Sequence, residues 1–265
     1  MQEKKVQVLV ATMNQKDFSI LSKMNIDSDA LIGNQCDENS IKKIVFKNHS
    51  IIFLNFNERG VGLNRNNALM RSKADYCIFS DDDVVFYDGY ATKIAETFQK
   101  KPNADVIVFN IDNEEDTVKR PIKRIFRVTR FNYMRYGAVR IAIKTRSIHE
   151  KGVFFNLCFG GGTAHSAGED TIFLHECLSK KIKIYAAPLT LGRLENNRPS
   201  TWFVGYNDKY FSDKGSLFRL IHPRLWKLFC LVDAFRHREL YKINPFIAYR
   251  RMVNKNGRVE KTSNR

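Results

Sequence analysis

Short apolar runs alternate along the first two thirds of the chain with longer segments of helical periodicity. The runs are rich in branched and aromatic residues and are bounded by polar ones, which is typical of buried strands. The predicted strands are 6–12, 30–33, 41–46, 50–56, 76–79, 105–111 and 183–187, the last closed by Pro188. The predicted helices are 18–24 with Asp17 as its cap, 62–72, 88–100 and one that opens at Glu169. This alternation predicts an α/β fold with a mainly parallel sheet flanked by helices.

Three adjacent carboxylates, Asp81, Asp82 and Asp83, follow where the buried run 76–79 ends. Like charges a few ångströms apart repel each other once they are partly removed from water. A divalent cation would explain the cluster. Hard oxygen ligands in a site open to water suit Mg²⁺ or Mn²⁺, which share one or two carboxylates with the phosphates of a nucleotide. A solvated acidic turn at the end of a strand is the alternative.

Polar residues also follow the first two predicted strands, in the segments 12–14 and 34–37. In a sheet of parallel strands, ligands bind beyond the carboxyl ends of the strands. We therefore expect both segments to converge with residues 81–83 on one crevice. Farther along, the glycine run 160–162 would admit the close approach of a ligand to the backbone, although by itself it indicates only a loop.

The composition is that of a globular protein with an acidic partner. The chain has 265 residues and a formal net charge of +16, which favours nucleic acid, an anionic lipid surface or a phosphorylated substrate. The five cysteines are scattered, which argues against a disulfide framework or a zinc site and for a reducing compartment. Neither a signal peptide nor a bilayer-crossing apolar run is evident. We expect a cytoplasmic protein that at most rests on the inner face of the cell membrane.

Basic residues concentrate in two stretches. Residues 119–146 hold ten Lys and Arg and no acid, and they form either a solvated face or a set that neutralises a diphosphate or a lipid phosphate. Residues 214–265 hold thirteen Lys and Arg against three acids. We predict a catalytic domain over 1–214 and a basic helical segment over 215–265.

The basic C-terminal segment is predicted to contain a helix from Pro223 to about Leu240, with the proline in its first turn. Its apolar residues are spread almost all round the helix. It therefore either packs on the main domain or enters a membrane interface with its basic residues at the headgroups. Residues 254–265 are predicted to be a disordered tail.

With these segments in hand, the chain resembles family 2 glycosyltransferases of the GT-A fold, particularly bacterial enzymes that build surface polysaccharides. The resemblance spans roughly residues 5–205. It rests on the first strand with its Thr12-Met13-Asn14 end, on a G-x(4)-R-N segment that ends in Arg65-Asn66, on the Asp81–Asp83 cluster and on Glu169-Asp170. Two features depart from the family pattern: Asn34-Gln35 replaces its acidic pair after the second strand, and no downstream metal-binding His is evident near 191–195.

The resemblance implies a Rossmann-like GT-A fold with a mixed, mainly parallel sheet. It also implies an inverting, metal-dependent transfer of a sugar from a nucleoside diphosphate sugar, a UDP-sugar by expectation, to a glycan or lipid-linked acceptor. Asp170 would be the general base, Glu169 and Trp202 would contact the acceptor, and Asp83 with Asp81 would hold Mg²⁺ or Mn²⁺. The residues implied to bind the nucleotide sugar are Thr12, Asn14, Gln35, Arg59, Arg65, Asn66, Asp81 and Asp82. We further expect Asp83 and Asp170 to face a common pocket.

Two other functions agree with part of the sequence. A nucleotidyltransferase that makes a nucleotide sugar would need a glycine-rich phosphate loop directly after the first strand, and residues 13–16 contain no glycine. A basic module that binds nucleic acid or membrane would agree with the charge. However, the chain carries no zinc-finger, RRM or helix-turn-helix signature, and the acidic clusters would repel phosphate backbones. No nucleic-acid partner is expected.

Overall fold

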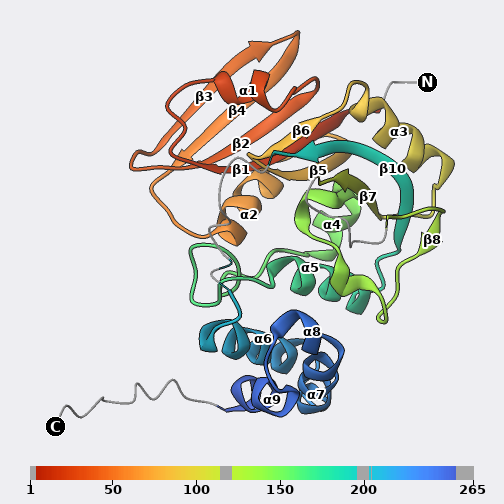
Figure 1. The fold of residues 1–265 in the computed structure, drawn as a ribbon. Helices are drawn as coiled ribbons and strands as arrows, with labels where there is room; N and C mark the ends of the chain where they lie inside the picture. The colour runs from red at the N-terminus through yellow and green to blue at the C-terminus, as the bar shows by residue number, and fades with distance from the viewer. Residues whose placement is uncertain (1–3, 114–120, 196–202, 204, 255–265) are drawn as a thin grey trace. The chain divides into compact units, whose positions relative to one another are not determined.

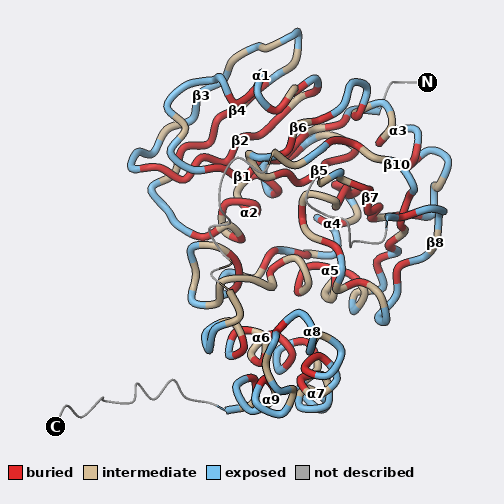
Figure 2. Tube along the Cα trace, in the orientation of Figure 1, coloured by how far each residue is buried: buried red, intermediate tan, exposed pale blue. Residues whose placement is uncertain are grey.

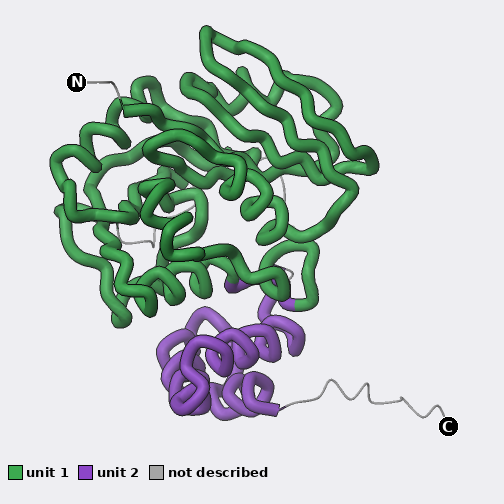
Figure 3. The backbone as a smooth tube through the Cα atoms, turned by 180° about the vertical axis from the view of Figure 1, so that it is seen from behind, with its two compact units in different colours: residues 1–164, 169–199 green, residues 165–168, 200–265 purple. Residues whose placement is uncertain are grey.

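The computed structural model describes residues 4–113, 121–195, 203 and 205–254 (Figure 1). Trp202, with its predicted acceptor contact, lies outside the described residues. The predicted tail lies outside them too, except for Asn254. The chain divides into two compact units, one of residues 1–164 and 169–199 and one of residues 165–168 and 200–265, coloured green and purple in Figure 3.

The first unit is built on one mixed sheet, in which ten strands are found within the described residues. Their order is β3-β4-β2-β1-β5-β9-β7-β10-β6, with β8 paired to β10. The ladders of β4, β2, β1 and β5 are parallel, as is that of β7 with β10, whereas β9 runs antiparallel between β5 and β7. The strands are β1 (Val6–Met13), β2 (Asp29–Gln35), β3 (Ser40–Phe46), β4 (His49–Phe56), β5 (Tyr76–Asp81), β6 (Val84–Phe86), β7 (Val106–Asp112), β8 (Phe126–Arg127), β9 (Ile141–Lys144) and β10 (Ile184–Leu194).

Helices cover both faces of this sheet, because successive residues of a strand point to opposite sides. Val8 and Val10 of β1 share a buried cluster with residues of α1 (Ser19–Lys23) and α3 (Tyr90–Lys100). Leu9 belongs to a second cluster with residues of α2 (Val61–Arg71), α4 (Thr145–Lys151) and α5 (Glu169–Ser179). Figure 2 shows the buried residues running along the central strands. The α/β architecture expected from the sequence is therefore present.

One predicted strand end is wrong. β10 was expected to stop at Pro188, but it continues to Leu194. A proline has no N–H to give to a ladder, and the pairing of β10 with β7 is indeed irregular between Ala186 and Thr190. The strand resumes beyond the proline, pairs with β6 and brings Glu195 to the turn at residues 81–83, where its N–H donates to the Asp83 carbonyl at 2.7 Å.

The second unit is helical and differs from the sequence prediction. Its helices are α6 (Asp208–Ile221), α7 (Trp226–Arg236), α8 (Arg238–Tyr241) and α9 (Pro245–Val253). Pro223 lies between α6 and α7 rather than in a first turn, and the single helix predicted to run to about Leu240 is two helices. The sequence analysis missed α6 and α9, although Asn207 and Asn244 cap them and Pro245 occupies the first turn of α9.

A buried carboxylate, Asp233 of α7, ties three of these helices together. Its Oδ1 lies 3.3 Å from Lys214 Nζ of α6 and 3.2 Å from His237 Nδ1, and Tyr241 Oη of α8 donates to its Oδ2 at 2.5 Å. Burial alone would raise the pKa of Asp233, but these partners outweigh burial and lower its pKa. Helix α6 contacts α9 at Gly215, where a Cβ would clash with the Met252 carbonyl oxygen.

None of the helices within the described residues has the length and apolar character needed to span a membrane.

Candidate active site

A buried arginine on α2 joins the two acidic segments predicted to form the site. The guanidinium of Arg65 donates from Nη2 to Asp81 at 2.7 Å, and from Nη1 to Glu169 at 2.9 Å and to Asp170 at 3.3 Å. The Arg65 side chain is only 4% exposed. Asp81 ends β5, whereas Glu169 and Asp170 open α5, so one side chain holds the strand end and the helix start together.

Arg65 remains charged in this position. Burial alone would lower the pKa of Arg65, but the charges of Asp81, Asp170 and Glu169 outweigh burial and raise its pKa. Its Cζ also lies 5.3 Å from the ring centroid of Phe155. Three carboxylates around one guanidinium leave the cluster with an excess of negative charge. Such a cluster can attract a cation or hold a proton.

Asp170 is the carboxyl group that the cluster perturbs most. Removal from water, followed by the charge of Glu169, raises the pKa of Asp170 well above the ordinary carboxyl value, and Arg65 opposes only part of this rise. The side chain keeps 27% of its surface exposed, so a solute can reach it. A half-buried carboxylate with a raised pKa accepts a proton more readily than an ordinary carboxylate, which is what a general base requires.

The three aspartates form the tight turn between β5 and β6. Asp81 is the last residue of β5 and Val84 the first of β6. Thr12, at the end of the neighbouring strand β1, donates its hydroxyl to Asp82 Oδ2 at 2.7 Å, and Gln15 Nε2 lies 3.5 Å from the same oxygen. The predicted convergence of the β1 end and the aspartate turn is therefore observed.

The donor set at this turn fits a hard divalent cation. Mg²⁺ and Mn²⁺ bind through one or two carboxylates and complete their shells with phosphate oxygens and water. Asp81 and Asp83 offer such oxygens from a turn that is half-buried to exposed. The described part of the chain gathers no group of three His, Cys, Asp or Glu side chains suited to a metal ion. Binding of Mg²⁺ or Mn²⁺ at this turn stays a prediction.

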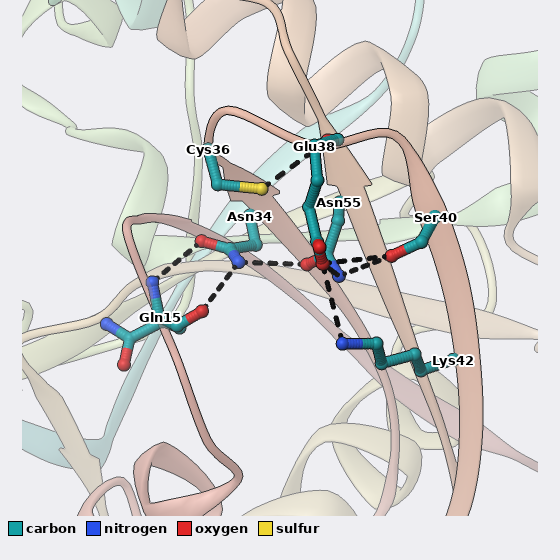
Figure 4. Close-up of polar contacts among 7 residues, drawn as sticks. All are labelled: Gln15, Asn34, Cys36, Glu38, Ser40, Lys42 and Asn55. Carbon is teal, nitrogen blue, oxygen red and sulfur yellow. Dashed lines mark hydrogen bonds and ion pairs between the residues drawn. The ribbon is translucent and has the colours of Figure 1, made fainter.

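A row of polar residues crosses the carboxyl ends of three parallel strands. Thr12 of β1 pairs in register with Asn34 of β2, and Asn34 with Asn55 of β4. The Asn34 amide donates to Asn55 Oδ1 at 2.8 Å and exchanges two hydrogen bonds of 3.0 Å with the backbone of Gln15 (Figure 4). Asn55 in turn donates to Glu38 Oε1 at 2.9 Å. The network thus links the carboxyl ends of β2 and β4 to the loop between β2 and β3.

The loop after β2 is fastened to the start of α2. Gln35 Oε1 accepts the N–H of Gly60 at 2.8 Å, and Arg59 Nη2 donates to Asp37 at 2.6 Å. The N–H of Asn14, a residue with a φ of 55°, donates to the Gln35 carbonyl at 2.9 Å. Gln35 therefore ends β2, and Asn14 and Arg59 lie in loops at the carboxyl edge of the sheet, where the sequence analysis expected Asn14 and Gln35. Their contact with a nucleotide stays a prediction.

Asn66 has a structural partner of its own. Its amide donates to the Phe155 carbonyl at 2.9 Å and its Oδ1 accepts the Phe155 N–H at 2.8 Å, so this buried side chain holds the loop before the glycine run. The glycines approach the site closely: a Cβ on Gly160, whose φ is 105°, would lie 2.9 Å from Glu169 Cδ. The role predicted for Asn66 in nucleotide binding stays a prediction.

Three residues of the polar network were missed by the sequence analysis: Gln15, Glu38 and Asn55. Asn55 carried a readable signal, because a polar amide interrupts the apolar run 50–56 near its end. Glu38 carried none, because it is one of several polar residues between two strands. The pairing of Arg65 with both acidic segments also required the fold, since sequence separations of 16 and 104 residues hide it.

Comparison with known proteins supports the resemblance drawn from the sequence. Residues 35–158 match the family described as glycosyl transferase family 2. No curated protein matches the sequence of this chain. The match covers β3 to β9, including α2 and the aspartate turn, but it stops before α5 and the second unit.

Solved structures of TarS from S. aureus have a similar fold. The structure of TarS 1–349 in complex with UDP-GlcNAc has a TM-score of 0.62 at 16% identity, covering 91% of this chain and 75% of that one. The complex of the same fragment with UDP has a TM-score of 0.61 at 15% identity, covering 91% of this chain and 74% of that one. A longer TarS structure has a TM-score of 0.59 at 12% identity, covering 93% of this chain and 54% of that one. The predicted GT-A type of α/β fold is thereby confirmed.

Proposed function

We propose that this chain is an inverting, metal-dependent glycosyltransferase of surface-polysaccharide synthesis, on the premise that residues 35–158 match the model of glycosyl transferase family 2. It would move a sugar from a nucleoside diphosphate sugar to a glycan or lipid-linked acceptor. The observation that carries the proposal is the Arg65 cluster, in which Asp81 from the strand end and Asp170 from the helix start bind one guanidinium.

Asp170 takes the proton of the acceptor hydroxyl in this proposal. The hydroxyl oxygen then attacks the anomeric carbon while the bond from that carbon to the diphosphate oxygen breaks on the opposite side, which inverts the configuration. Positive charge develops on the sugar ring in the transition state, as in glycoside cleavage. The excess of carboxylate charge around Arg65 opposes the loss of a proton from Asp170 in the free enzyme and favours its gain during the reaction.

Arg65 and Glu169 position the base. The guanidinium fixes Asp170 through Nη1 and shares that nitrogen with Glu169, which is buried and would orient the acceptor through its other oxygen. Because Arg65 also binds Asp81, a displacement of the aspartate turn would be transmitted to the base. The predicted contact of Trp202 with the acceptor completes this side of the proposal.

The donor side lies at the carboxyl edge of the sheet. Thr12, Asn14, Gln35, Arg59 and Asp82 lie at or just beyond the strand ends, where we expect the nucleotide to bind. Asp83 and Asp81 would hold Mg²⁺ or Mn²⁺, which when bound neutralises charge on the leaving diphosphate. A UDP-sugar is the proposed donor, and the UDP-GlcNAc and UDP complexes of TarS support that choice.

Release of UDP from a panel of UDP-sugars, with Mg²⁺, with Mn²⁺ and with a chelator, tests this function. We expect metal-dependent release for at least one donor. Calorimetric titration of UDP should show tighter binding with metal, and Asp83→Ala should remove that difference. Asp88→Ala, an exposed carboxylate near the same strands, is the matched control. Equal affinity with and without metal in the unaltered protein would contradict the metal role.

A further inference from the structure

One helix of the second unit turns an apolar face to solvent. Residues 225, 228, 232 and 235 follow the 3-4-3 spacing that places side chains on one side of a helix. On α7 and the residue just before it, these are Leu225, Leu228, Val232 and Phe235, and each exposes between 44% and 56% of its surface. The buried residues of α7, such as Cys230 and Ala234, lie on the other side. The helix therefore packs by its narrow, small-residue side and leaves its larger apolar side uncovered.

The exposed surface continues onto α9. The ring of Phe246, at 61% exposure, meets the ring of Phe235 edge to face with 5.4 Å between centroids. We use the name apolar patch for Leu225, Leu228, Val232, Phe235 and Phe246. Single exposed apolar residues are ordinary on a protein surface, but a contiguous group on two helices marks an interaction site.

Uncompensated positive charge surrounds this unit. Each acid among residues 205–254 has a basic partner there, in the pairs Arg251–Asp208, Lys209–Asp213, Lys214–Asp233 and Arg238–Glu239. Six further basic side chains are exposed and form no ion pair with another described residue: Arg219, Arg224, Lys227, Arg236, Lys242 and Arg250. Arg224, Lys227 and Arg236 are direct sequence neighbours of patch residues.

We propose that the apolar patch docks on an anionic lipid surface, with Leu228, Val232 and Phe235 entering the headgroup boundary. Interfacial protein surfaces combine apolar side chains that enter the acyl region with Lys and Arg at the headgroup level. A second copy of the chain fits the patch less well, because face-to-face contact would bring the same unpaired positive charges together. Nucleic acid fits less well too, because three of the five patch residues are aliphatic and offer no stacking surface for bases, and the two Phe rings pack edge to face on each other.

This docking is separate from sugar transfer. It rests on residues of the second unit alone and needs no part of the Arg65 cluster. A surface-bound enzyme would meet lipid-linked acceptors at the headgroup plane, which narrows the two acceptor classes of the proposed function to one.

Vesicle flotation of the full chain tests the docking. We expect binding to vesicles of phosphatidylcholine mixed with phosphatidylglycerol, weaker binding to pure phosphatidylcholine, and loss of binding as salt rises. The double variant Leu228→Gln/Phe235→Gln should lower the partition coefficient about tenfold or more, since each side chain gives up a buried apolar area. The matched control is Ile41→Thr/Val45→Thr, which removes two exposed apolar residues from β3 and should bind like the unaltered protein.

A second variant acts on charge and leaves the apolar patch intact. Arg224→Gln/Lys227→Gln should weaken binding to the mixed vesicles about thirtyfold at low salt, because each basic residue near an anionic surface contributes about 1 kcal/mol. It supplies the test if the apolar double variant fails to fold. UDP release from a donor in vesicle-free buffer should be unchanged in both variants, so failure of the transferase and failure of the docking are distinguishable.

Three results would overturn the proposal. The first is no flotation with the mixed vesicles, and the second is equal flotation with pure phosphatidylcholine at all salt concentrations. The third is a dimer in light scattering that Leu228→Gln/Phe235→Gln converts to a monomer, which would assign the patch to a second copy of the chain.

Discussion

The two units each bury an ionic cluster, and the clusters are electrostatic opposites. In the first unit one cation, Arg65, is surrounded by three carboxylates, and the pKa of Asp170 is raised. In the second unit one carboxylate, Asp233, is surrounded by Lys214, His237 and Tyr241, and its pKa is lowered. A charge that is fully compensated stabilises a fold, whereas a surplus of like charge leaves one group ready to exchange a proton.

Replacing the proposed base should have the largest effect on activity. Asp170→Asn cannot accept the acceptor proton, so the rate of transfer should fall by about 10²–10⁴-fold, the range of general-base contributions. The affinity for UDP in the presence of metal should change little, because Asp170 is not among the residues proposed to bind the nucleotide. Glu176→Gln, a half-buried carboxylate farther along α5 that pairs with Lys180, is the control. Turnover of Asp170→Asn at the rate of the unaltered protein would refute the assignment of the base.

Removing the central cation should cost the most stability. Arg65→Met leaves three carboxylates without their shared partner, and loss of one member of a buried pair typically costs about 3–5 kcal/mol. Urea unfolding measures this change. Arg71→Met, on the same helix but exposed, should cost less than about 1 kcal/mol. A small loss of unfolding free energy in Arg65→Met would mean that Arg65 is not needed to hold the three carboxylates together.

The two clusters should respond in opposite directions to loss of a carboxylate charge. The pKa of Asp233 is lowered on folding, so its charge adds stability above the unfolded pKa, and this contribution disappears as the pH falls through the folded pKa. Asp233→Asn should therefore destabilise by about 1–3 kcal/mol at neutral pH and by less in acid. Asp208→Asn, an exposed carboxylate of the same unit, is its control.

The charge of Asp170 has the opposite effect on stability. Its pKa is raised on folding, so its ionisation costs stability as the pH rises from the unfolded value through the folded one. Asp170→Asn should thus stabilise the protein at neutral pH while removing activity, and each unit of pKa shift corresponds to about 1.4 kcal/mol. Thermal unfolding of Asp233→Asn and Asp170→Asn under the same conditions measures both changes in stability. Destabilisation by both would show that the clusters are alike.

Much of the first unit could be predicted from the sequence because its signals are local. The run at 76–79 is apolar throughout and bounded by polar residues, so its burial between two helical layers follows from composition alone. Residues at the ends of parallel strands meet at one edge, so the segments 12–14 and 81–83 were expected to converge, and Thr12 does contact Asp82.

The remaining features depend on contacts that no local pattern encodes. The charge of Arg65 is compatible with a solvated helix face, and only the packing of α2 under β5 and α5 turns it inward. β10 passes Pro188 because its neighbours resume the pairing beyond the irregularity. In the second unit, Pro223 predicted the first turn of one helix to about Leu240, but it lies between α6 and α7, and the predicted helix is divided into α7 and α8.

The pH dependence of kcat/KM for sugar transfer tests the central claim most directly. Protonated Asp170 cannot act as a base, so activity should be present at high pH and be lost as the pH falls through its raised pKa. The account predicts an acidic limb with its midpoint clearly above about 4, the ordinary carboxyl value, and no such limb in the residual activity of Asp170→Asn. A limb at the ordinary carboxyl value, or one that persists in Asp170→Asn, would contradict it.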